Sequence, residues 1–272
     1  MTGGANLLIL LAGLLAAGAA AGFASGLFGI GGGFVVVPAL ILILPLLGGS
    51  PAEWTHVAVG TSLATIIVTS LRSAQAHARR QSVDFAFIRS WAPWVALGTV
   101  GGILLADQVS GSTLAMIFGI GVLLFSIQFL LPQMHDRQLL AAAPDGAMRM
   151  GLAGGLGMVS ALLGIGGGTI TTVVMTLCGT PIHRAIGTAS GMGGIIAIPG
   201  AIGFAIIGLG RAGLPWGSVG FVNFPAATAI VAMSLLTAPL GVAAAHRLSP
   251  ALLRTVFGFY LIVTGVTMLS HS

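Results

Sequence analysis

The sequence contains very little charge and no lysine. Only 6% of its 272 residues are charged, with ten arginines against five acidic residues, whereas a soluble domain carries roughly 25% charged residues. Uncharged stretches cover residues 1–52, 90–106, 108–135, 150–183 and 212–246. Because 56% of the residues are hydrophobic, a water-facing shell cannot be assembled, which excludes a soluble globular protein.

Cysteine and buried carboxylates are also scarce. Cys178 is the single cysteine, which excludes an intrachain disulfide and a cysteine-based metal site. No Asp or Glu lies deep in an apolar stretch, so no carboxylate proton relay is visible. The sequence has no Walker loop, no HExxH motif and no Ser/His/acid set in register. It therefore predicts no enzyme, no cofactor and no metal. The arginines lie between apolar segments and do not indicate nucleic acid binding.

The apolar segments predict an all-α integral membrane protein with eight to ten membrane segments. About 20 helical residues span a hydrocarbon core about 30 Å thick. We expect segments at 5–28, 34–47, 57–78, 88–106, 111–131, 148–163, 168–180, 184–208, 218–245 and 250–269. Such a protein is predicted to be multi-pass in the inner (plasma) membrane, with the lipid bilayer as partner and a homo-oligomer possible.

The second half of the sequence repeats the first. The glycine runs 29–33 and 164–168 match, each preceded by a serine, Ser25 or Ser160. The other matched positions are His56, Gly60, Thr61, Gly102, Ser110, Leu114, Phe118 and Gly119 with His183, Gly187, Thr188, Gly241, Ser249, Leu253, Phe257 and Gly258. The sequence thus predicts a first membrane repeat over 1–131, a cytoplasmic linker over 132–147 and a second repeat over 148–272.

The arginines indicate how the two repeats are oriented. If each glycine run joins two segments into a hairpin, each half crosses the membrane an odd number of times and the halves are inverted. Eight arginines then share one side, and Arg211 alone lies on the other. The eight are Arg79, Arg80, Arg89, Arg137, Arg149, Arg184, Arg247 and Arg254. The parallel alternative divides the arginines less sharply, so the positive-inside rule favours inverted halves with the arginine-rich face cytoplasmic.

The glycine runs are the first candidate site. Gly31, Gly32, Gly33 and Gly166, Gly167, Gly168 are expected to break the helix and to begin a new one. Non-helical backbone at membrane depth must line a cavity or be buried in protein, and a helix N-terminus attracts anions. The two hairpin tips are expected to meet near the midplane and to face the substrate. Close helix packing through small residues is the alternative function of these glycines.

Polar side chains near the runs are further candidates. The hydroxyls are Thr61, Ser62, Thr169, Thr188 and Ser190. Each of them either donates to the substrate or bonds to a neighbouring helical turn. His56 and His183 either cap helices near the membrane surface or bind a ligand. Arg72 is close enough to the cytoplasmic interface to extend its charge there, and a contact with the charge of the substrate is the alternative.

The paired GIGGG runs, Pro38 and the segment HVAVGTSLA at 56–64 resemble the TauE/SafE sulfite exporter family over nearly the whole chain. The resemblance implies a permease for small sulfur-containing anions such as sulfite, sulfoacetate or related organosulfonates. The second repeat departs from the pattern at 187–194, where Ala189 replaces the serine found at Ser62.

The main hypothesis is therefore a secondary transporter that exports such an anion by alternating access. A transporter or channel for another small anion is the alternative, and a membrane-embedded scaffold or enzyme has less support. The sequence offers no ring of charge to select ions, which disfavours a channel.

Overall fold

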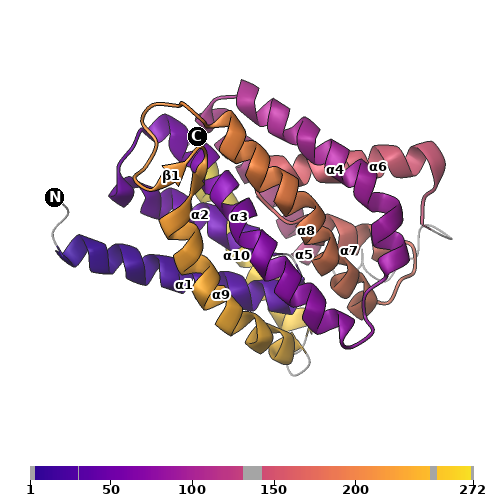
Figure 1. The fold of residues 1–272 in the computed structure, drawn as a ribbon. Helices are drawn as coiled ribbons and strands as arrows, with labels where there is room; N and C mark the ends of the chain where they lie inside the picture. Colours follow the sequence, from indigo (N-terminus) through magenta and orange to yellow (C-terminus); the bar gives the residue numbers. More distant parts are fainter. Residues whose placement is uncertain (1–3, 30, 131–142, 246–249, 271–272) are drawn as a thin grey trace.

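The computed structural model describes residues 4–29, 31–130, 143–245 and 250–270. In the first half these residues form α1 (Gly4–Phe28), α2 (Gly33–Ile43), a short 3-10 helix (Leu44–Leu47), α3 (Pro51–Ala78), α4 (Phe85–Gln108) and α5 (Gly111–Leu130) (Figure 1). In the second half they form α6 (Gly146–Leu162), α7 (Gly168–Leu177), α8 (Ile182–Ile207), strands β1 (Ser218–Val219) and β2 (Val222–Asn223), α9 (Phe224–Ala245) and α10 (Pro250–Ser270). The predicted all-α fold class is confirmed, and the two short strands form one additional hairpin.

The long helices are suited to lipid. Within the described parts of the chain, six helices are long and apolar enough to cross a membrane, namely α1, α3, α4, α5, α8 and α9. Their outer faces expose large apolar side chains. On α8, for example, Ile198, Ile202 and Ile206 are exposed and share one face because they are four residues apart. Apolar faces of this kind belong in contact with lipid, and the chain is a multi-pass membrane protein.

The segment expected at 218–245 was placed too early. The helix begins only at Phe224, because residues 218–223 form the antiparallel β1–β2 hairpin, with Ser218 opposite Asn223. Gly217 and Gly220 have positive φ values of 80° and 54°, which favour glycine and end helical geometry. Apolarity alone did not reveal this turn.

Two other boundaries differ from expectation. Helix α3 begins at Pro51 rather than at 57, because proline is well suited to the first helical turn. The expected linker at 132–147 falls mostly on residues 131–142, which lie outside the described residues, and its last two residues already belong to α6.

Helices from the two halves pack in a reciprocal pattern. Helix α1 packs on α9 and α6 on α4, while α3 packs on α8 and α5 on α10. Glycines permit the closest approaches: a Cβ on Gly22 would lie 2.5 Å from Cα of Ser234, and one on Gly102 would lie 2.6 Å from the carbonyl oxygen of Met158. Each first helix of one half therefore lies against the fourth helix of the other.

The packing has one asymmetry between the halves. Helices α2 and α7 both pack on the third helix of their own half, α3 or α8. Helix α2 also packs on α1, whereas α6 and α7 share at most marginal contact. The first hairpin is thus closed along its length, and the second is held mainly through α8.

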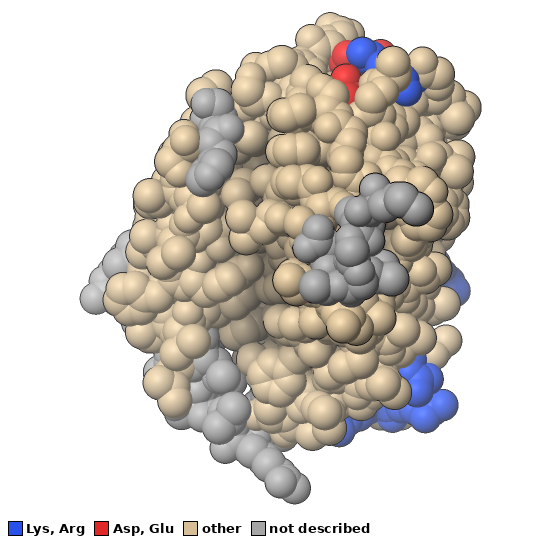
Figure 2. Space-filling model, turned by 90° about the vertical axis from the view of Figure 1, so that its left-hand side faces the viewer, with Lys and Arg blue, Asp and Glu red and all other residues tan. Residues whose placement is uncertain are grey.

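Two ion pairs mark the opposite ends of the bundle. Helix α3 runs toward Arg79 at one end of the bundle. Helix α4 starts after Asp84 at that same end and runs back to Asp107 at the other end. Arg184 pairs with Asp84 at 2.9 Å, and Arg211 pairs with Asp107 at 3.1 Å. We call the end with Arg79, Arg80, Arg89, Arg149 and Arg184 the arginine-rich end, and the end with Glu53, Asp107 and Arg211 the acidic end. Figure 2 shows charged side chains gathered toward two ends, with acidic ones only at the upper end of the face in view.

Candidate substrate site at two glycine turns

The helix breaks fall on the glycine runs. We define the first glycine turn as Gly29, Gly31 and Gly32, with φ values of 68°, 74° and 82°. The second glycine turn is residues 164–167, where Gly164 and Gly167 have φ values of 60° and 65°. Gly32 and Gly167 are the N-cap residues of α2 and α7, both in the left-handed conformation. Glycine adopts this conformation without the penalty that a Cβ brings, so the runs end one helix and start the next.

The two glycine turns touch each other inside the protein. A Cβ added to Gly31 would lie 3.6 Å from Cα of Gly166, and one on Gly33 would lie 2.9 Å from Cα of Ile165. Ile66, about midway along the long helix α3, borders both turns, at 3.2 Å and 3.0 Å from Cβ positions on Gly31 and Gly166. The structure therefore brings together the two runs that are far apart in the sequence.

Two hydroxyls of α3 hold the turns in place. Ser62 Oγ donates to the carbonyl oxygen of Gly164 at 2.8 Å, and Thr69 Oγ1 donates to that of Gly31 at 3.2 Å. Ser62 was a candidate for either substrate contact or a bond to a neighbouring helical turn, and its hydroxyl bonds to the backbone of the second glycine turn. Thr69 was missed. It follows Ser62 by two helical turns, and Ser73 continues the same face, so a polar stripe along α3 was the available signal.

Other hydroxyls near the turns have no hydrogen-bond partner in the described part of the chain. The buried Oγ atoms of Ser25, Ser160, Thr169 and Thr171 make no hydrogen bond among the described residues. Buried hydroxyls are normally hydrogen-bonded, so these groups are available to a ligand or to water. Ser160 Oγ lies 3.1 Å from the position of a Cβ on Gly167. Thr169 was among the sequence candidates, and Ser25 and Ser160 are the matched serines of the two halves.

Thr61 and Thr188 have equivalent structural roles. Thr61 Oγ1 accepts the backbone N–H of Asn223, and Thr188 Oγ1 accepts that of Asp84, both at 2.8 Å. The two donor residues, Asn223 and Asp84, precede α9 and α4, and their own side chains cap those helices. These threonines therefore anchor helix starts of the opposite half.

Ser190 is the one hydroxyl of its block that reaches the first glycine turn. Its Oγ accepts from Ser73 Oγ at 3.1 Å and donates to the carbonyl oxygen of Ile186 at 3.0 Å. It also lies 3.1 Å from a Cβ position on Gly29. Ser190 therefore links α3 and α8 at the edge of the turn.

The two histidines lie at opposite ends and not at the turns. His56 is buried near the acidic end, with Nε2 3.0 Å from the carbonyl oxygen of Ala106 and its ring stacked on Phe221. His183 is exposed at the start of α8, where it lines a small cavity of about 30 Å³ with His77 and Arg80. The structure does not bring these repeat-related residues together.

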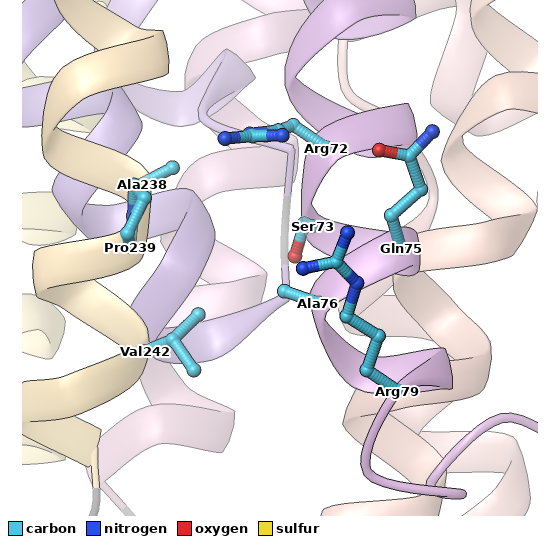
Figure 3. A pocket seen from close by; sticks show the side chains of 8 residues that line it. All are labelled: Arg72, Ser73, Gln75, Ala76, Arg79, Ala238, Pro239 and Val242. Atoms are coloured by element: carbon cyan, nitrogen blue, oxygen red, sulfur yellow. The ribbon is translucent and has the colours of Figure 1, made fainter.

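Arg72 lines a larger cavity between α3 and α9. The cavity has a volume of about 170 Å³ and is lined by Arg72, Ser73, Gln75, Ala76, Arg79, Ala238, Pro239 and Val242 (Figure 3). Both arginine side chains are exposed, and Ser73 is buried at 2% exposure. We call this cavity the arginine pocket. Among the described residues, no group of three or more His, Cys, Asp or Glu side chains is arranged to hold a metal ion.

Comparison with known proteins identifies relatives along nearly the full chain. A family model described as sulfite exporter TauE/SafE matches residues 14–268. A Haemophilus influenzae protein named probable membrane transporter protein is 33% identical over 255 residues, which cover 93% of this chain and 96% of the relative. A Methanocaldococcus jannaschii protein with the same description is 27% identical over 270 residues, or 96% of each chain. No solved structure matches the chain significantly.

Proposed function

Because the chain belongs to the TauE/SafE family, we propose that it is a secondary transporter that exports a small sulfur-containing anion by alternating access. Its relatives are named membrane transporters, so the chain is a membrane transporter and not an enzyme. The substrates we propose are sulfite, sulfoacetate or a related organosulfonate. The observation that supports this most directly is the contact between the two glycine turns midway along α3.

The proposed site lies where the N-termini of α2 and α7 approach each other. The first N–H groups of a helix have no acceptor within it, and the helix dipole makes this end favourable for negative charge. Four buried hydroxyls without a hydrogen-bond partner among the described residues lie in α7 and in the helices that lead into the two turns. They are Thr169 and Thr171 in α7, Ser25 in α1 and Ser160 in α6. These groups give hydrogen-bond donors and a partial positive charge, which is the complement of an oxyanion.

We also propose that the halves are inverted in the membrane, with the arginine-rich end cytoplasmic. Helices α3 and α8, the matched third segments, lead in opposite directions between the two ion pairs. The arginine-rich end contains most of the described arginines, as the positive-inside rule expects of a cytoplasmic face. In transporters of this architecture the substrate binds between the repeats, and one repeat moves against the other. Helix α2 packs on α1, whereas α7 has at most marginal contact with α6. This difference supports two different conformations of the repeats.

Counterflow in proteoliposomes tests this function. Purified protein in sealed vesicles preloaded with unlabelled sulfite should accumulate ³⁵S-sulfite transiently, with saturable kinetics. Sulfoacetate and methanesulfonate should compete, and chloride at the same concentration should not. A current that rises linearly with voltage and shows no counterflow would assign a channel instead. Vesicles that accumulate chloride or phosphate but no sulfonate would refute the substrate class.

A further inference from the structure

The arginine pocket holds two positive charges with no acidic neighbour in its lining. Arg72 lies on α3, Arg79 follows the last residue of that helix, two helical turns beyond Arg72, and both belong to the lining. Figure 3 shows the two guanidinium groups on the side of α3 that faces α9 across the cavity. Neither arginine forms an ion pair with any described residue, and the carboxylate of Asp84 is already bound by Arg184 at 2.9 Å. Two uncompensated guanidinium groups create a local positive potential that attracts anions.

One lining residue of the pocket is linked through a hydrogen bond to the edge of the first glycine turn. Ser73 lines the pocket and donates to Ser190 Oγ at 3.1 Å. Ser190 Oγ in turn lies 3.1 Å from a Cβ position on Gly29. One turn earlier on α3, Thr69 donates to the carbonyl oxygen of Gly31. The hydroxyls of Thr69, Ser73 and Ser190 therefore lie between the pocket and the turn.

The position of the pocket suits a loading site. Ser73 lies five residues before the end of α3 at Ala78, or about 8 Å along the helix at 1.5 Å per residue. The opposite wall is the last part of α9, which ends at Ala245. The pocket is therefore near the arginine-rich end rather than at the middle of the bundle. Its volume of about 170 Å³ exceeds by far the 10–15 Å³ or so that one water molecule needs, so a hydrated oxyanion fits.

We propose that the arginine pocket is a peripheral oxyanion site, in which Arg72 and Arg79 bind the sulfite or sulfonate group of the substrate before it moves past Ser73 and Ser190 to the glycine turns. This proposal rests on the proposed function. The guanidinium group binds oxyanions through paired N–H donors, which a lysine ammonium does not reproduce. A phospholipid headgroup has the same chemistry, so the experiment includes an arm for each source.

The first arm measures transport from each face. Right-side-out and inside-out vesicles present opposite faces to ³⁵S-sulfite. Arg72→Gln and Arg79→Gln should each raise KM about tenfold for sulfite offered at the arginine-rich end, equivalent to about 1.4 kcal/mol. The maximal rate and the KM from the acidic end should stay within about threefold. Arg72→Lys keeps the charge and should give a smaller rise in KM. Arg89→Gln is the matched control, because Arg89 is exposed at the same end and does not line the pocket; its KM should not change.

The second arm measures binding without transport. In nanodiscs of neutral lipid, sulfite and methanesulfonate should raise the melting temperature of the parent protein and should raise that of the Arg72→Gln, Arg79→Gln double variant less. If the parent protein binds both anions through these arginines but transports neither, the pocket stands and the proposed function fails. If the variants transport sulfite with parental KM from both faces, the function stands and the pocket is refuted.

The third arm addresses lipid. Native mass spectrometry of protein from membranes with phosphatidylglycerol reports any retained lipid. Retention by the parent and loss in the double variant, together with equal sulfite affinity for both in neutral lipid, would assign the pocket to a headgroup and overturn the proposal. An equal rise in KM in Arg89→Gln would also overturn it, because general surface charge would then be the cause.

Discussion

Gly166→Ala separates substrate contact from backbone strain at the glycine turns. Gly166 belongs to the second turn but, unlike Gly164 and Gly167, it has no positive φ. An added Cβ would lie 3.4 Å from Cα of Gly193 and 3.9 Å from Cα of Gly31, which are ordinary contacts. Only Cγ2 of Ile66, at 3.0 Å, has to shift, by a few tenths of an ångström. Alanine is therefore compatible with the fold at this position.

The expected effects on folding and on binding differ in size. The small displacement of Ile66 should cost about 1 kcal/mol or less, because larger overpacking costs begin near that value. The methyl group, however, would project between the two turns, where the anion is proposed to bind. Loss of one hydrogen bond to a charged group costs about 1.5–3 kcal/mol, which corresponds to roughly a 10- to 150-fold rise in Kd. Binding should thus suffer far more than stability.

Gly167→Ala is the adjacent comparison. Gly167 has a φ of 65°, and its added Cβ would collide with Cδ1 of Ile196. The left-handed conformation alone costs an L-residue about 1–2 kcal/mol, or roughly 2–8 °C in melting temperature for a chain of about this size. Gly32→Ala has the same difficulty, because Gly32 has a φ of 82° and the carbonyl oxygen of Ala21 would lie 2.9 Å away. Loss of binding in these two variants cannot be separated from loss of structure.

The assay is a sulfite titration of purified Gly166→Ala beside the parent protein, after both pass a check of monodispersity and melting temperature. We expect a melting temperature within a few degrees of the parent and a Kd at least tenfold higher. A well-folded Gly166→Ala protein that binds and transports sulfite as the parent does would refute the reasoning. The glycine turns would then serve helix packing alone.

Three further predictions concern the frame around the site. Thr61→Val should lower stability by about 1–3 kcal/mol in thermal melts, since a buried backbone N–H loses its acceptor, and a raised KM with unchanged stability would contradict this. Gly98→Ala should destabilise by about 1–3 kcal/mol, because its Cβ would collide with backbone of α6, whereas Gly101→Ala meets only a methionine methyl at 3.4 Å and should melt as the parent does. Ala147 and Ala212 are both exposed. In a background without the native cysteine, Ala147→Cys and Ala212→Cys should react with an impermeant thiol reagent from opposite sides of the membrane. Labelling of both from the same side would exclude the proposed topology.

The sequence by itself determined the class of the protein and the places where its helices break. Scarcity of charge and long apolar runs have one physical solution, a helical membrane protein, because only there can such a surface remain exposed. Consecutive glycines likewise indicate a break locally, since their freedom at positive φ does not depend on distant partners. The matched positions of the halves, such as Ser25 with Ser160, were visible without coordinates because they come from comparing the two halves of the sequence.

Tertiary structure alone decided what the polar residues do. The sequence left substrate contact and bonding within the protein open for Thr61, Thr188 and Ser62. In the structure Thr61 and Thr188 accept N–H groups from the opposite half, and Ser62 holds a glycine turn. Arg72 looked like an interfacial residue of one helix, yet it lines a pocket whose other wall comes from α9. A hydroxyl or a guanidinium group has several equally good partners, and local sequence does not favour one over another. The choice among them depends on which segments the folded chain brings within hydrogen-bond distance.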